Sequence, residues 1–183
     1  MSVWLYIIGV SEAGPKALTD KAINLIHSAD LIVAASRFNL ALSQMLGSTD
    51  RVIGFPSPLA DLYVSLDHHR DNQLDTSKRN LVCVLATGDP LWFGIGASLI
   101  ERYGATSCKL IPNISGLQMA AARMGWPLAT TRILSVHGRD AERILPSCQR
   151  RARLLVIAAS GHSAGAIAQL LTDQGYCDAE ITA

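Results

Sequence analysis

The sequence has little net charge and few charged residues. Lys, Arg, Asp and Glu together make up 17% of its 183 residues, and the formal net charge is +1. This balance argues against a protein that binds nucleic acid through its overall field, although a local basic patch remains open. Because 49% of the residues are apolar, we expect a folded globular chain with a core sufficient for one large domain or two small ones.

The sequence also lacks a convincing leader or membrane segment. The N-terminal run MSVWLYIIGV has no basic residues before it and stops at Ser11 and Glu12. It is too short to span a membrane and is a poor signal peptide. We therefore expect a cytoplasmic protein without a membrane partner.

The sequence also lacks paired metal-ligating residues. The four cysteines are far apart in the sequence and form no CxxC pair; they are Cys83, Cys108, Cys148 and Cys177. We expect them to be small buried hydrophobic residues of a reducing compartment, not disulfides or zinc ligands. The adjacent His68 and His69 point to opposite sides of any regular element, so residues 61–80 are predicted to be a solvated helix and loop. We expect no metal site.

The most informative stretch that is present is LVCVLATGDPLWFGIG, residues 81–96. Its first six residues are an unbroken apolar run, which is typical of a strand buried on both faces of a parallel sheet. Gly88 and Pro90 then demand a tight turn, and a helix is predicted over residues 97–103. A strand that opens into a glycine-rich loop is where open α/β sheets bind small ligands.

The remaining chain alternates between apolar strands and helices. Further strands are expected at residues 4–10, 31–35, 51–55, 107–111, 133–137 and 153–159. This alternation predicts right-handed βαβ units and a mostly parallel sheet, with Thr19 capping the first helix. We expect an α/β protein with domains at residues 1–112 and 113–183, the second incomplete, with a further strand beginning near the C-terminus.

Two loops have features of their own. Ser115 and Gln118 form a capping box before a helix over residues 117–124 that stops at Gly125, and the free amides of such a helix start suit polar or anionic ligand groups. The loop from Gly9 to Gly14 invites a dinucleotide-binding interpretation. It is not GxGxxG, however, and a single glycine loop is weak evidence.

Three stretches together resemble the tetrapyrrole (corrin/porphyrin) methylases, which use S-adenosylmethionine. They are IIGVSEAG with LTDKA, VLATGDPLWFGIG, and PNISGLQMAAARMGWPLATTRILSVHGRD. The chain is most similar to the branch that methylates carbons 5 and 15 of a precorrin in cobalamin biosynthesis, in particular its N-terminal, carbon-5 part. The resemblance runs from Tyr6 to about Ile181 and implies two αβα domains with the cofactor in the cleft between them.

The resemblance also implies which residues contact the cofactor. In the first domain and the segment after it they are Gly9, Gly88, Asp89, Pro90, Trp92, Ile95, Asn113, Ile114, Ser115 and Gly116. In the second domain, Ala158 and Ala159 would contact the adenine side. The chain departs from the family pattern at Ser11, where a second glycine is usual, and at residues 36–40, where a basic pair and a histidine are usual.

Methyl transfer to an electron-rich carbon needs alignment and a dry site more than acid–base groups. No Ser–His–Asp or paired-carboxylate pattern is visible, so no catalytic residue is assigned. The implied substrate carries many carboxylates, for which Arg37, Arg123 and Arg139 are candidate ligands. His137 is a candidate donor to a substrate carboxylate, while Asp89 is expected mainly to shape its turn.

Several alternatives remain open from the sequence. The chain could be another enzyme of the superfamily, such as a diphthine synthase or a ribosomal RNA ribose methyltransferase. It could be a nucleotide-binding module without methyl transfer, or a non-catalytic fragment that binds a partner half or dimerises. The resemblance favours a homodimer with a tetrapyrrole substrate, and it allows a carbon-15 methyltransferase/decarboxylase domain, fused or separate.

Overall fold

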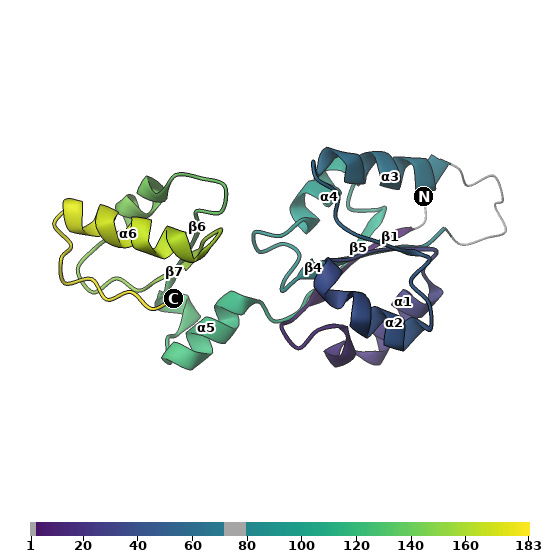
Figure 1. The fold of residues 1–183 in the computed structure, drawn as a ribbon, viewed down its shortest axis with the longest axis horizontal. Helices are drawn as coiled ribbons and strands as arrows, with labels where there is room; N and C mark the ends of the chain where they lie inside the picture. Colours follow the sequence, from purple (N-terminus) through teal and green to yellow (C-terminus); the bar gives the residue numbers. More distant parts are fainter. Residues whose placement is uncertain (1–2, 72–79) are drawn as a thin grey trace. The chain divides into compact units, whose positions relative to one another are not determined.

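The computed structural model describes residues 3–71 and 80–183, which fall into two compact units that divide between Gly116 and Leu117. The first unit contains a five-stranded sheet with the strand order β3-β2-β4-β1-β5 (Figure 1). The strands are β1 (Leu5–Val10), β2 (Leu31–Val33), β3 (Val52–Ile53), β4 (Val82–Thr87) and β5 (Cys108–Ile111). Every pairing is parallel, as the strand–helix alternation predicts.

The centre of the sheet is formed by β1 and β4, which pair along their whole length from Leu5–Val82 to Val10–Thr87. All residues of β4 except Thr87 are buried, which confirms the prediction of a strand covered on both faces. The other neighbour of β1 is β5, which forms the edge of the sheet. The buried apolar runs of the sequence are therefore the middle of the sheet, and its edges are shorter.

Two helices cover each face of this sheet (Figure 1). One face carries α1 (Asp20–Ser28) and α2 (Asn39–Leu46), and the other carries α3 (Ala60–Asp71) and α4 (Gly96–Tyr103). As predicted, Thr19 caps α1, because its side chain accepts a hydrogen bond from the Ala22 N–H at 3.4 Å. The alternating residues of β1 divide between the two cores, with Ile8 packed on the α1 side and Ile7 on the α3 side.

The connections from the two central strands leave toward opposite faces. The chain after β1 enters α1 on one face, and the chain after β4 enters α4 on the other. Open α/β sheets bind their ligands at the carboxyl edge, beside the point where the connections of two adjacent strands leave toward opposite faces. The loops after β1, β4 and β5 are therefore the candidate ligand-binding region.

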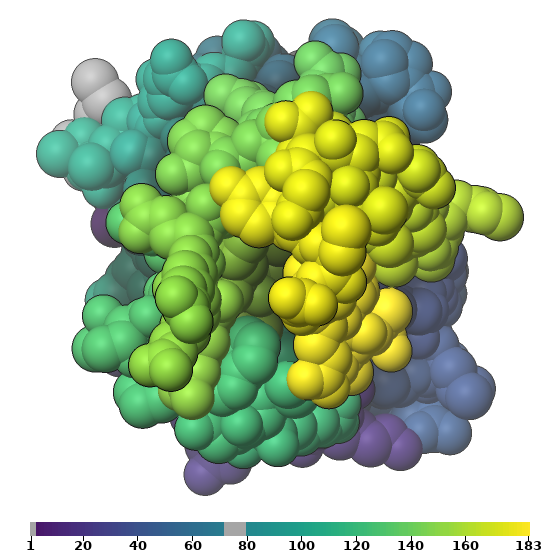
Figure 2. Space-filling model, turned by 90° about the vertical axis from the view of Figure 1, so that its left-hand side faces the viewer, coloured from purple at the N-terminus to yellow at the C-terminus, as the bar shows by residue number. Residues whose placement is uncertain are grey.

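The second unit contains α5 (Gly116–Met124), β6 (Arg132–Ser135), β7 (Leu154–Ile157) and α6 (Gly161–Asp173). The two strands are parallel, and Val136 and Ile144 pack with Ile167 in the core. Between β6 and β7 lies a 3-10 helix, η4 (Ala141–Ser147), with Pro146 inside it. The strand expected at the C-terminus is absent, because residues 179–183 take no regular structure and are exposed. Figure 2 shows these last residues, in yellow, on the outside of the unit.

The cysteines follow the prediction in part. Cys83 and Cys108 are buried in the sheet, where burial raises the pKa of the Cys83 thiol to about 12. Cys148 is half-buried, whereas Cys177 is exposed and does not fit the expectation of a buried residue. Neither unit has, among its described residues, a helix with the length and apolar character that a membrane span requires.

The polar helix α3 is less solvated than its sequence suggests. Leu62 and Leu66 are fully buried on the sheet, and His69 lies on the same helical face three residues later. The His69 side chain is half-buried, and its Nε2 finds no hydrogen-bond partner among the described residues. Burial lowers the pKa of His69, the Asp30 carboxylate opposes this, and His68 adds to it. The loop predicted after this helix falls outside the described residues.

This environment predicts a loss of stability on acidification. In the unfolded chain His69 takes up a proton near its ordinary pKa, whereas in the folded chain its pKa is lower. The free energy of unfolding therefore falls as the pH drops from the unfolded-state pKa to the folded-state pKa. We expect His69→Gln to flatten the dependence of stability on pH between about pH 7 and about pH 5. Urea denaturation at several pH values measures it. His162→Gln, at an exposed histidine, is the control, and an equal flattening by both variants would contradict the assignment.

Candidate functional site

Three strand ends meet at the carboxyl edge of the sheet, at Gly9, Gly88 and Asn113. A Cβ atom built on Gly9 would stand 2.2 Å from the Gly88 carbonyl oxygen and 2.8 Å from the Asn113 backbone nitrogen. Real Cβ atoms do not approach backbone so closely, so only glycine allows the loops after β4 and β5 to close on the end of β1. The contact brings the backbones of Gly9, Gly88 and Asn113 together, and we call this group of residues the floor.

Gly88 adds a second constraint. Its φ is +66°, in the left-handed region that side chains disfavour. A Cβ on Gly88 would also stand 2.8 Å from the Ser115 Cα. The turn after β4 therefore packs directly on the backbone at Ser115, and two distant parts of the sequence are joined by contacts that glycine alone permits.

The Asn113 side chain fastens this arrangement. Its Nδ2 donates a hydrogen bond to the Gly9 carbonyl oxygen at 3.0 Å, and its Oδ1 accepts one from the Ile114 N–H at 2.8 Å. Asn113 therefore bridges the end of β1 and the segment that follows β5. This role was not apparent in the sequence, because the two partners of the first bond are 104 residues apart.

The loop between β4 and α4 is held by its own hydrogen bonds. The Asp89 carboxylate accepts a hydrogen bond from the Leu91 N–H at 2.8 Å, and the Gly96 N–H donates to the Pro90 carbonyl oxygen at 2.9 Å. Pro90 is buried, and the side chains of Trp92 and Ile95 are half-buried. The observed bond gives Asp89 a turn-shaping contact.

Replacing Asp89 tests whether this loop shape supports ligand binding. Asp89→Ala removes the acceptor for the Leu91 N–H, so we expect the affinity for S-adenosylhomocysteine to fall by about threefold to tenfold. Asp89→Asn keeps an oxygen acceptor and should retain most of the affinity. Isothermal titration measures both variants, and unchanged affinity in Asp89→Ala would remove Asp89 from the site.

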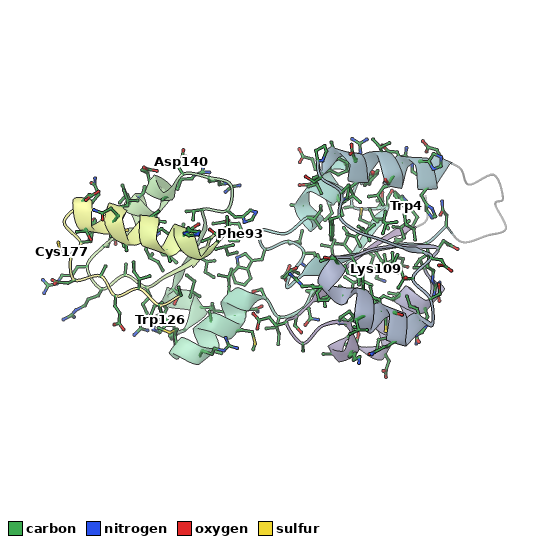
Figure 3. The ribbon with its side chains drawn as sticks, in the orientation of Figure 1. Trp4, Phe93, Lys109, Trp126, Asp140 and Cys177 are labelled. Carbon is green, nitrogen blue, oxygen red and sulfur yellow. The ribbon has the colours of Figure 1, made fainter. Side chains whose placement is uncertain are left out.

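Phe93 at the tip of this loop was missed by the sequence reasoning (Figure 3). It has a φ of +56°, which is rare for an aromatic residue, and its side chain is 49% exposed. Leu91 in the same loop and Ile114 beside Ser115 are exposed by 55% and 52%. An isolated exposed apolar side chain is ordinary, but three on the two loops that meet at Gly88 and Ser115 give this edge an apolar character.

Helix α5 begins directly after the segment that contacts Gly88. The helix begins at Gly116, which puts the buried Ser115 at the N-cap position and Gln118 at the third helical position, as predicted. The first backbone N–H groups of a helix have no partner within it, and they favour polar or anionic groups. The predicted residues Ile114, Ser115 and Gly116 thus follow Asn113 in the segment that contacts Gly88.

A hollow of about 460 Å³ lies beside these loops. Its lining residues are Ser11, Glu12, Gly14, Pro15, Arg37, Phe38, Ala41 and Thr87. They come from the loop after β1, from the 3-10 turn η2 (Ser36–Phe38) with the start of α2, and from the last residue of β4. Arg37, predicted as a substrate ligand, is exposed and donates from Nη2 to the Thr87 hydroxyl. Phe38 is 6% exposed and belongs to the core, so it is not a surface replacement for the basic residue usual there.

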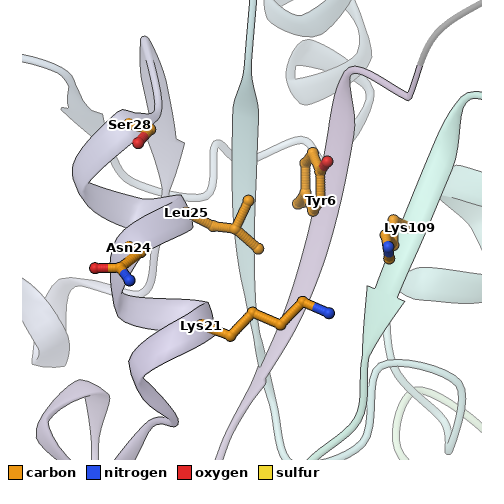
Figure 4. A pocket seen from close by; sticks show the side chains of 6 residues that line it. All are labelled: Tyr6, Lys21, Asn24, Leu25, Ser28 and Lys109. Atoms are coloured by element: carbon orange, nitrogen blue, oxygen red, sulfur yellow. The ribbon is translucent and has the colours of Figure 1, made fainter.

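A second hollow of similar size, about 470 Å³, lies elsewhere on the first unit (Figure 4). Its lining residues are Tyr6, Lys21, Asn24, Leu25, Ser28 and Lys109. Tyr6 and Lys109 are paired across β1 and β5, and both lie near the starts of their strands. This hollow is therefore not formed by the strand-end loops, and the sequence reasoning assigned none of its residues to a site.

The other predicted residues belong to the second unit. His137 and Arg139 follow β6, and Ala158 and Ala159 follow β7. The strands are parallel and the Val136 N–H donates to the Ile157 carbonyl oxygen at 2.8 Å, so these four residues share one edge of the two-stranded sheet. His137 and Arg139 are exposed, as is Arg123 in the last turn of α5. In the second unit the predicted residues thus divide between this sheet edge and α5.

The chemistry available in the first unit is that of binding and alignment. At the carboxyl edge of the sheet it offers the close backbone contacts of Gly9 and Gly88, exposed apolar side chains and the exposed Arg37. Among the described residues, no group of three or more His, Cys, Asp or Glu side chains could hold a metal ion. The close contacts of Gly9 and Gly88 gather backbone polar groups at this edge, and a few convergent backbone groups are what orient a small ligand in its site.

Comparison with known proteins identifies the family of the chain. Residues 4–183 match the family described as Tetrapyrrole (Corrin/Porphyrin) Methylases. The chain is 32% identical over its full length to a decarboxylating precorrin-6Y C(5,15)-methyltransferase of Sinorhizobium sp, of which it spans 42%. It is 30% identical over 74% of its length to the cobalt-precorrin-7 C(5)-methyltransferase of Salmonella typhimurium, spanning 62% of that protein. The chain thus spans less than half of the first relative.

Solved structures share the fold. The precorrin-6Y methylase of Archaeoglobus fulgidus matches with a TM-score of 0.57 at 24% identity, over 84% of this chain and 72% of that one. A uroporphyrin-III C-methyltransferase of Thermus thermophilus, complexed with S-adenosylhomocysteine, matches with a TM-score of 0.66 at 19% identity, over 94% and 77% of the two chains. At these identities the likeness is one of fold.

Proposed function

Because the chain belongs to the tetrapyrrole methylase family, we propose that it binds S-adenosylmethionine and forms the carbon-5 methylating part of a precorrin methyltransferase of cobalamin biosynthesis. The observation that carries the proposal is the backbone contact of Gly9, Gly88 and Ser115 at the carboxyl edge of the sheet. The family match over residues 4–183 and the two relatives named for carbon-5 methylation support it.

In this proposal the cofactor lies on the glycine-lined floor. Gly9 and Gly88 keep side chains away from it, and the turn from Asp89 to Ile95, including Pro90 and Trp92, forms its wall. Asn113 to Gly116 supply backbone polar groups. Ala158 and Ala159, small residues after β7, remain proposed contacts of the adenine. When bound, S-adenosylmethionine supplies the methyl group.

The chain's residues then have to hold the acceptor carbon in line and exclude water. The exposed side chains of Leu91, Phe93 and Ile114 offer an apolar surface to the macrocycle. Arg37 is proposed to bind a substrate carboxylate, and Arg139 and His137 are proposed to do so from the second unit. No residue is proposed as a catalytic acid or base.

The proposal extends to the assembly. We expect a homodimer in the cytoplasm, with carbon-15 methylation and decarboxylation belonging to a further domain or a separate protein. Sedimentation equilibrium of the purified chain tests the dimer directly.

Transfer of an isotope-labelled methyl group tests the activity. The chain is incubated with labelled S-adenosylmethionine and a freshly prepared precorrin, and the macrocycle is analysed for label at carbon 5. Labelled product is the expected result. Cofactor binding without any transfer would contradict the enzymatic part of the proposal and favour a fragment that binds without turnover.

A further inference from the structure

Arg37 is held by two side-chain contacts that the sequence did not reveal. Its Nη2 donates to the hydroxyl of Thr87, which is the last residue of β4 and lies 50 residues away in the sequence. Its guanidinium carbon lies 4.7 Å from the centroid of the Phe38 ring, a distance at which a cation is attracted to the ring. The arginine is therefore fixed from one end by a hydroxyl and from one face by an aromatic ring.

The two supports are themselves rigid. Thr87 is in register with Val10 at the end of the central strand pair, so its position is set by the sheet. Phe38 is 6% exposed and packs in the core formed with α1 and α2, so its ring cannot move without disturbing that core. An arginine held in this way loses little side-chain entropy when it binds a ligand.

The guanidinium retains donors for a ligand. It has five N–H groups in a planar fork that matches a carboxylate, and the Thr87 hydroxyl takes one of them. Within residues 3–71 and 80–183, no carboxylate forms an ion pair with Arg37. Glu12 lines the same hollow, but its Oε1 lies beside Gly116, 4.0 Å from where a Cβ on that residue would stand.

We propose that the hollow beside Arg37 binds one carboxylate side chain of the macrocycle, and that Thr87 and Phe38 are positioning residues that set the Arg37 guanidinium for it. This inference rests on the proposed function and adds a subsite to it. The hollow has a volume of about 460 Å³, enough to admit an acetate or propionate arm, and it opens beside the cofactor loops. Phe38 thus contributes a stacking platform for the Arg37 guanidinium.

The test uses uroporphyrin, a stable porphyrin with acetate and propionate arms, as the probe. Its affinity for the full chain is measured by titration of the porphyrin absorbance band, with a cationic porphyrin that lacks carboxylates as the control ligand. We expect Arg37→Gln to weaken uroporphyrin binding by about tenfold. Thr87→Val should weaken it by about threefold, while Thr87→Ser, which keeps the hydroxyl, stays within about twofold of the parent.

The double variant separates positioning from a general structural effect. If Thr87 acts through Arg37, Thr87→Val causes no further loss in the Arg37→Gln background. Independent, additive losses in the two variants, equal affinity of Arg37→Gln and the parent, or no binding of uroporphyrin by the parent would each overturn the proposal. Thr87→Val is isosteric at an exposed strand end, so we expect it to fold.

Calorimetry with S-adenosylhomocysteine distinguishes this proposal from the proposed function. Arg37 and Thr87 are not among the proposed cofactor contacts, so their variants should bind S-adenosylhomocysteine as the parent does. Cofactor binding together with an unaltered uroporphyrin affinity in Arg37→Gln would overturn the subsite alone. Absence of cofactor binding by the parent would count against the proposed function instead.

Discussion

Gly88→Ala is expected to reduce the affinity for S-adenosylhomocysteine by more than roughly tenfold, a larger loss than Asp89→Ala should cause. The added methyl group would stand 2.8 Å from the Ser115 Cα, so the turn after β4 and the segment after β5 must separate. The backbone also has a φ of +66°, which costs alanine about 1 kcal/mol. Isothermal titration measures the affinity, and urea denaturation measures the accompanying loss of stability.

Gly47→Ala is the matched control, because it has a similar backbone angle without the close contact. Gly47 follows α2 with a φ of +77°, and a Cβ there would have nothing within 4 Å. We expect this variant to lose about 1 kcal/mol of stability and no affinity. Equal affinities of the two variants would show that the contact between Gly88 and Ser115 does not form the binding floor.

Asn113→Ala is expected to cost about 2 kcal/mol of stability and to weaken cofactor binding with it. Both bonds of the side chain are lost, so the Gly9 carbonyl oxygen and the Ile114 N–H are left without this partner. The loops after β1 and β5 then lose the bridge that holds them together. Thermal or urea denaturation gives the stability, and titration gives the affinity.

The order of three variants makes this prediction specific. Asn113→Asp replaces the donating Nδ2 with an oxygen that faces the Gly9 carbonyl oxygen, so it should be at least as damaging as Asn113→Ala. Asn39→Ala, at an exposed asparagine at the start of α2, should change neither quantity beyond about 0.5 kcal/mol. If Asn113→Asp were better tolerated than Asn113→Ala, the bond to Gly9 would not have the proposed role.

The sequence predicted several elements of both units well because their signals are local. The run from Leu81 to Ala86 is apolar without interruption, and such a strand can only be buried on both faces. Thr19 and Asp20 mark the start of α1, and Gly125 follows the last residue of α5. Each of these elements depends on residues within one or two helical turns, so one sequence is sufficient to find them.

The contacts that build the site could not be predicted in the same way. The bond from Asn113 to Gly9 spans 104 residues, and the bond from Arg37 to Thr87 spans 50. Whether two such residues meet depends on strand order, and the order β3-β2-β4-β1-β5 is not encoded by any local pattern. The residues proposed for the cofactor came from a family resemblance. The reason why Gly9 and Gly88 must be glycine came from the structure.

The failed predictions have local physical causes. His69 was assigned to a solvated element because its neighbours are polar, yet its spacing from Leu62 and Leu66 places it on the buried face of α3. A further strand was expected to begin near the C-terminus, but residues 179–183 have no partner strand among the described residues and stay irregular.

Cofactor binding is the central claim, and isothermal titration of this chain with S-adenosylhomocysteine tests it most directly. NADH serves as the parallel ligand, because the glycine-rich loops alone would also suit a dinucleotide. We predict that S-adenosylhomocysteine binds, that NADH does not, and that Gly88→Ala weakens the binding by more than roughly tenfold while Gly47→Ala retains it. Binding of NADH in place of S-adenosylhomocysteine would contradict the claim.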